Sequence, residues 1–350
     1  MVSPKKPRRL SRQAVNTLIF GIGLALALTA PAARAGEAYF TGFENFTTGD
    51  DTIIGTDSWT GSHAGLKLHG VMSEAQHGVP GIGNAAYIGG YATTTANTTN
   101  KTVYVRRVVN LDPVALNQEV ATFSVTFGIK DSVATTKRDN FEFVIYNQAG
   151  AVLGGIQFDN TTLDSSTQEP RRLIYRLSWN GTAFQYVLTS FTFLPETLET
   201  LRLRINYRTN RWTASLSDVP IFQDIPFYTG SVTKNLGSVM VKMAVGNAAA
   251  NTNYILPGDN YMLFDNYSVR TDPVTTTLAI TKNLTGAAKL SWNEEAGYSY
   301  QVQYSTDAKT WKSDLANSSH TASLTQTASF TDPTTPVPAK RLYRIQTTAP

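Results

Sequence analysis

The chain has 350 residues, no cysteine, and 30 lysines and arginines against 26 aspartates and glutamates, for a formal net charge of +4. Six of the basic residues and none of the acidic ones fall within residues 1–35, so the rest of the chain carries 24 basic against 26 acidic side chains, a net charge of −2. This balance lacks the basic footprint that nucleic-acid binding needs, and the missing cysteines exclude disulfides, thiol catalysis and thiolate metal sites.

Residues 1–35 are typical of an export signal. A basic segment that ends at Arg12 is followed by an apolar run from Thr17 to Ala30 and by the small-x-small sequence Ala33-Arg34-Ala35. The apolar run is short for a membrane span of about 20 residues, so cleavage after Ala35 is favoured over retention as an anchor. We therefore expect a secreted, periplasmic or cell-surface protein, exported by the general secretory route and without a membrane contact after cleavage.

Residues 38–270 repeatedly alternate apolar and polar side chains, the pattern of half-buried antiparallel strands. The alternation is clearest at residues 121–130 and 201–207. Further strands are predicted at residues 141–146, 152–158, 172–178, 212–216, 239–245 and 261–269, and no segment has a sustained helical period. More than ten strands in one stretch predict an all-β fold with a single two-sheet antiparallel jelly-roll sandwich.

Three of the four histidines lie close together in the segment SHAGLKLHGVMSEAQHG, as His63, His69 and His77, with Glu74 among them. Imidazoles and a carboxylate could bind zinc or serve a polysaccharide lyase. Their spacing is looser than that of metal-ligand pairs on a rigid element, so a polar surface strand and loop is the favoured interpretation.

The segment YMLFDNYSVR, residues 261–270, reads as a strand with one unexpected residue. Leu263, Asp265, Tyr267 and Val269 share a parity, which predicts that Asp265 points to the same face as its apolar neighbours. A carboxylate facing a packed interior needs a cation or several donors, so the position implies a partner, a local twist or a metal ion.

Residues 271–277 interrupt the alternation and are predicted to be a linker, and residues 278–350 are predicted to form a small β-domain. Its candidate core strands include Leu290, Trp292, Tyr300 and Val302. About 75 residues suit a seven-stranded immunoglobulin-like sandwich.

The large domain, residues 36–270, resembles the concanavalin A-like (LamG-like) jelly rolls of secreted bacterial proteins. The resemblance is carried by the opening FTGFENFTTGDDTIIGTDSWTGS, by the two middle segments YRLSWNGTAFQYVL and LRLRINYRTNRWTASL, and by the closing FDNYSVR. Residues 278–350 resemble fibronectin type III-like modules, on YSYQVQYSTDAKTWKS and ASFTDPTTPVPAKRLYRIQ. Such modules space or attach other domains and imply no catalysis.

In jelly rolls of this kind the first and last strands lie side by side, which implies that Glu44 lies near Asp265. Two adjacent carboxylates repel each other, whereas a hard cation with backbone carbonyls would stabilise both. We therefore predict a structural Ca²⁺ site on Glu44 and Asp265, with a further ligand from residues 45–51. The alternative is an Asp265 that accepts backbone N–H groups or an arginine at a strand irregularity.

The resemblance covers lectins as well as glucanases, so binding and catalysis both have to be weighed. Glucanases of this fold carry a Glu-x-Asp-x-x-Glu run on one strand, and no such run occurs here. We therefore expect a non-catalytic protein that binds a polysaccharide, a cell-surface glycan or other extracellular material. Trp59, Tyr91 and Asn97 are the predicted ligand contacts, with Trp59 as an exposed loop aromatic. A hydrolase or lyase with a dispersed active site is one alternative, and a structural surface protein without a small ligand is another.

Overall fold

The computed structural model describes residues 36–62, 65–90, 102–131, 138–167, 169–244, 259–283, 286–334 and 341–350. Within these ranges the protein is built from antiparallel strands and one single-turn helix, α1 (Glu74–His77). No helix in them has the length and hydrophobicity needed to cross a bilayer. The predicted export signal lies outside the described residues.

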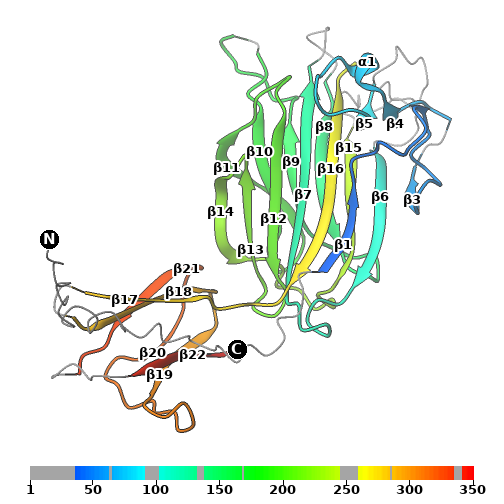
Figure 1. The fold of residues 1–350 in the computed structure, drawn as a ribbon. Coiled ribbons are helices and arrows are strands. Elements are labelled where there is room, and N and C mark those ends of the chain that lie inside the picture. Colours follow the sequence, from blue (N-terminus) through cyan, green and yellow to red (C-terminus); the bar gives the residue numbers. More distant parts are fainter. Residues whose placement is uncertain are drawn as a thin grey trace, which may run out of the picture. The chain divides into compact units, whose positions relative to one another are not determined.

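One sheet of the large domain has nine strands. They are β14 (Val219–Pro226), β13 (Arg211–Leu216), β12 (Glu199–Asn206), β7 (Val120–Lys130), β16 (Tyr261–Asp272), β5 (Ala85–Gly89), β4 (His69–Met72) and β2 (Gly49–Asp50) in spatial order, with β1 (Gly36–Thr41) also paired to β16. The other sheet has seven strands. Their order is β11 (Phe184–Thr192), β10 (Leu173–Trp179), β9 (Val152–Asp159), β8 (Asn140–Tyr146), β15 (Leu236–Ala244), β6 (Thr102–Leu111) and β3 (Trp59–Gly61). The predicted all-β antiparallel sandwich is confirmed, and Figure 1 shows its two sheets face to face.

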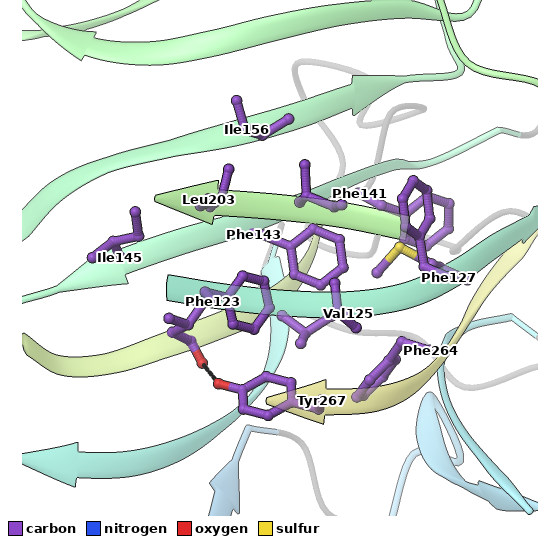
Figure 2. Close-up of a cluster of buried hydrophobic side chains, with 14 of the residues drawn as sticks. Phe123, Val125, Phe127, Phe141, Phe143, Ile145, Ile156, Leu203, Phe264 and Tyr267 are labelled. Carbon is purple, nitrogen blue, oxygen red and sulfur yellow. Dashed lines mark hydrogen bonds between the residues drawn. The ribbon is translucent and has the colours of Figure 1, made fainter. Parts of the chain in front are cut away.

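The core lies between these two sheets because alternate side chains of each strand point toward the opposite sheet. Phe123, Val125 and Phe127 of β7 meet Phe141 and Phe143 of β8 (Figure 2). Tyr267 of β16 lies in the same cluster, and its buried hydroxyl donates a hydrogen bond of 2.8 Å to the carbonyl oxygen of Val239. The alternation predicted for residues 121–130 therefore places the apolar set inside, as expected.

The chain closes the sandwich by bringing the two ends of the large domain together. β1 pairs antiparallel with β16, from Gly36 opposite Thr271 to Thr41 opposite Tyr267. The expectation that the first and last strands lie side by side is confirmed.

Residues 278–348 form two three-stranded antiparallel sheets. One contains β17 (Leu278–Lys282), β18 (Ala288–Glu294) and β21 (Gln326–Thr331), and the other contains β20 (Ser319–Thr321), β19 (Ser299–Ser305) and β22 (Leu342–Thr348). Leu290, Trp292, Tyr300 and Val302 form part of a separate buried cluster, as predicted. The segment that connects β16 to β17 is shorter than the predicted linker, because Thr271 and Asp272 still belong to β16.

Candidate functional site

The strand that carries Asp265 contains one extra residue at that position. Asp265 lies opposite Thr126 of β7, and the next pair joins Ser268 to Ser124, so three steps on β16 match two on β7. Asn266 adopts a left-handed backbone with φ of 50°. Such an insertion is a β-bulge, which bends the strand and re-aims its side chains.

The bulge reverses the alternation of β16. Met262 and Phe264 face the core before it, and Tyr267 and Val269 face the core after it. The prediction that Asp265 shares a face with Tyr267 and Val269 is therefore wrong, because a strict period of two assumes a regular strand. Asp265 instead points to the outer side of the nine-stranded sheet, at the kind of irregularity that we considered as an alternative.

Asp265 and Glu44 line the same pocket. Its volume is about 650 Å³, and Gly42, Asn45 and Asp57 also contribute to its wall. The backbone N–H of Asn84 donates to both carboxylate oxygens of Glu44, at 3.2 Å from Oε1 and 3.3 Å from Oε2. A methyl group in place of hydrogen at Gly83 would lie 1.9 Å from Glu44 Oε1, so only glycine allows this approach.

The carboxylate of Asp265 is incompletely satisfied. The residue is only 3% exposed, and Oδ1 has no hydrogen-bond partner among the described residues. Oδ2 accepts from Nδ2 of Asn266 at 3.1 Å. Burial raises the pKa of Asp265 to about 6; the hydrogen bond from the Asn266 backbone acts against this rise, and the negative charge of Glu44 adds to it.

The predicted ligand contacts do not assemble into a site. Trp59 is 1% exposed and lies in the core, where Nε1 donates to Tyr39 Oη at 2.9 Å. The expectation of an exposed loop aromatic is wrong because β3 pairs with β6 and turns the indole inward, so no ring face is left for a ligand. Tyr91 and Asn97 lie outside the described residues.

The histidine segment is structural where it is described. His69 and His77 are buried, contrary to the expected surface position. His69 Nε2 lies 2.8 Å from the Ser62 carbonyl oxygen, and His77 Nε2 lies 2.9 Å from the Gly83 carbonyl oxygen. His63 lies outside the described residues, and no three acidic, histidine or cysteine side chains cluster as metal ligands within the described ranges.

A second polar cluster, which the sequence pattern did not reveal, lies on the outer face of the seven-stranded sheet, the side that points away from the nine-stranded sheet. Strand register aligns Tyr104, Lys242, Glu142 and Gln157 in one row across β6, β15, β8 and β9. Glu142 is 2% exposed and is the centre of the row. It accepts hydrogen bonds from Lys242 Nζ at 2.9 Å and from Gln157 Nε2 at 3.1 Å.

Tyr186 completes this cluster from the sheet edge. Its hydroxyl donates to Glu142 Oε1 at 2.8 Å, although β10 and β9 lie between β11 and β8. A side chain can reach across two strands only where the sheet curves toward that face, so the outer face is concave here. One of the residues crossed is Gly155, which has no side chain to obstruct the ring.

Two tyrosine hydroxyls of this face, those of Tyr186 and Tyr146, are held in the protonated form. Burial, followed by the charge of Glu142, raises the pKa of both Tyr186 and Tyr146 above the ordinary value. The hydroxyl of Tyr186 is therefore a donor to Glu142 at neutral pH. The residue nevertheless remains 45% exposed to solvent.

The chain matches no protein-family model and no curated protein sequence. Among solved structures it is similar to alginate lyase Aly36B, at 10% identity over 67% of this chain and 96% of that chain, with a TM-score of 0.43. It is also similar to an endo-β-1,4-glucuronan lyase from the fungus Trichoderma reesei (10% identity, 68% and 99% covered, TM-score 0.36) and to the metal-free Emp46p carbohydrate recognition domain (11%, 69% and 100%, TM-score 0.42). Similarity at this level says nothing about the ligand or chemistry of the present chain.

Proposed function

We propose that the large domain binds carbohydrate on the outer face of the seven-stranded sheet, with Tyr186 as the stacking residue. The observation that carries the proposal is a tyrosine that is 45% exposed while its hydroxyl is fixed by a hydrogen bond to Glu142. Such a ring loses little conformational freedom when a flat apolar surface, such as one face of a pyranose, packs on it.

The groups around the ring suit a sugar ligand. Lys242 and Gln157 keep further N–H groups for hydroxyl oxygens after each has donated one to Glu142. Tyr104 and Tyr175 lie on the same face and are partly exposed. Concave sites with aromatic surface and a few fixed polar groups are the usual form of small-ligand sites in proteins.

The test is a glycan array followed by calorimetric titration of the hits, on the wild type and on Tyr186→Ala. Loss of the ring removes the stacking surface, and we expect at least a tenfold rise in Kd. Phe40→Ala is the matched control, because Phe40 is 52% exposed but lies on β1 of the other sheet. Equal affinity of wild type and Tyr186→Ala, or an equal loss in Phe40→Ala, would reject Tyr186 as the stacking residue.

The same titrations separate the alternatives. No glycan binding by the wild type would favour a structural surface protein. Release of reducing ends or of unsaturated products from a polysaccharide would favour a hydrolase or a lyase. Glu142 is a buried carboxylate of this face and is the residue we would test first as an acid or base in either reaction.

We also propose that Glu44 and Asp265 bind a structural Ca²⁺ ion. The unpartnered Oδ1 of Asp265 supports this, because it is buried in a pocket that Glu44 also lines. Calcium prefers carboxylate, amide and carbonyl oxygens, and Asn45 offers a further oxygen in the same wall. A bound cation would replace the repulsion between the two carboxylates with attraction.

A further inference from the structure

The edges of the two large sheets differ in how well they are protected against pairing with another strand. β2 and β3 have two and three residues. β14 carries Pro220 and Pro226 together with register shifts, and β1 carries Glu37 at a bulge. Short length, proline, charge and bulges are the devices that keep an edge strand unpaired.

β11 has none of these protections over its regular part. Its nine residues, FQYVLTSFT, include no charged residue and no proline. Among the described residues it pairs only with β10, in an unbroken register from Phe184 to Leu188, and the register shifts only beyond that point. The open side of residues 184–188 therefore presents a regular row of backbone donors and acceptors.

Exposed apolar side chains gather at the same edge. Tyr186, Val187 and Leu188 are 45%, 37% and 51% exposed, and Leu194 follows shortly after the strand. Val219, also exposed, begins β14, the edge strand of the other sheet that lies beside β11 (Figure 1). Tyr186 and Leu188 project from one face of β11 and Val187 from the other, so this edge exposes apolar side chains on both sides of the sheet.

We propose that β11 pairs with β11 of a second copy of this chain. A two-fold axis perpendicular to the sheet makes the two strands antiparallel and closes both open edges in one step. Because the strand carries no charge, self-pairing opposes no like charges, which is the main obstacle to the pairing of identical edges. The result is one continuous sheet of fourteen strands, twice the seven of each copy, with both outer faces on the same side.

This arrangement has a consequence for ligand binding that does not depend on which ligand is bound. Tyr186 of each copy would stand near the junction, so the two outer faces would form one longer groove. Two linked sites bind a repeating polymer more tightly than one site binds it, because the second contact is intramolecular.

The test is the mass of the purified protein in solution, measured by light scattering and by sedimentation at low salt. We expect twice the mass of one chain at about 0.1 mM, where a dimer with a Kd below that value is mostly assembled. With residues 184–188 paired to the same residues of the second copy, the two lysines of Gln185→Lys are diagonal neighbours across the junction, and we expect at least a tenfold rise in the dissociation constant. Gln185 is exposed, so the substitution leaves the core intact.

A charge-reversed variant makes the test specific. Gln185→Glu alone should dissociate in the same way, and an equimolar mixture of the lysine and glutamate variants should recover the dimer. Leu116→Lys, which places a charge at an exposed apolar residue away from β11, is the control and should leave the mass unchanged. A monomeric wild type, a dimer that Gln185→Lys does not weaken, or a mixture that stays monomeric would each overturn the proposal.

Discussion

Asp265 makes the stability of the protein depend on pH in an unusual direction. Its folded-state pKa of about 6 lies above that of an aspartate in an unfolded chain, about 4. A raised carboxyl pKa favours the folded state while the group is protonated. The contribution is therefore fully present below about pH 4 and is lost as the pH rises through 6.

We expect Asp265→Asn to be more stable than the wild type at pH 7 in the presence of a chelator, because no buried charge has to form. Calcium should raise the Tm of the wild type at pH 7, raise it less at pH 5 where Asp265 is protonated, and leave Asp265→Asn unchanged. Asp218→Asn is the control, because that exposed carboxylate pairs with Arg202 at the surface. Thermal unfolding at both pH values, with and without calcium, measures this, and a wild-type Tm that is indifferent to calcium would exclude the site.

Trp59 contributes to stability through its packing. The indole contacts Tyr39, Phe43 and Tyr267 and is fully buried. We expect Trp59→Ala to lower the free energy of unfolding by about 3 to 5 kcal/mol. Urea denaturation gives this value, and titration of the surviving folded protein should show an unchanged Kd for any glycan. A weakened Kd without a loss of stability would restore Trp59 as a ligand contact.

Among the elements, the bulge of β16 decides where the Asp265 carboxylate points. Asn266 forms the bulge by adopting a left-handed backbone conformation, which asparagine and glycine tolerate and β-branched residues do not. We expect Asn266→Val to destabilise the protein by roughly 1 to 2 kcal/mol more than Asn266→Gly does, because valine adds the steric cost of this conformation. The difference between the two variants in urea denaturation isolates the backbone term, since both lose the bond to Asp265. Equal destabilisation would mean that the side-chain bond alone fixes the bulge.

The elements also show what the residue pattern can and cannot predict. β7 and β12 have one buried and one partly exposed face, so apolar and polar residues alternate along them and their inward residues are predicted correctly. β11 is exposed on both faces near its middle, so Tyr186 and Leu188 gave no comparable signal. The cluster around Glu142 depends on the register between four strands, which the alternation within single strands does not specify. One asparagine beside Asp265 was the only local sign of the bulge.

For the whole molecule, the composition and the strand spacing were enough to predict the all-β sandwich, whereas the division into a large and a small domain stays a prediction. They were not enough to predict the position of the proposed ligand site, because each outer face of the sandwich offers aromatic and polar residues. The polar neighbours of Trp59 in the sequence indicate an exposed loop, but residues adjacent along the chain do not determine whether the indole is buried. Export and the fibronectin-like character of residues 278–350 stay predictions from the sequence.

The central place of β16 has a further consequence for how the chain reaches this structure. β16 separates β7 from β5 in the nine-stranded sheet, and it also pairs with β1, whose residues precede it by more than 200 positions. Contacts between residues so distant in sequence carry a large loop-closure entropy and slow the rate of folding. Until the segment around Tyr261 has been synthesised, β5, β4 and β2 have no strand to join them to the rest of that sheet. The large domain should therefore assemble late and cooperatively, after the ribosome has passed residue 272.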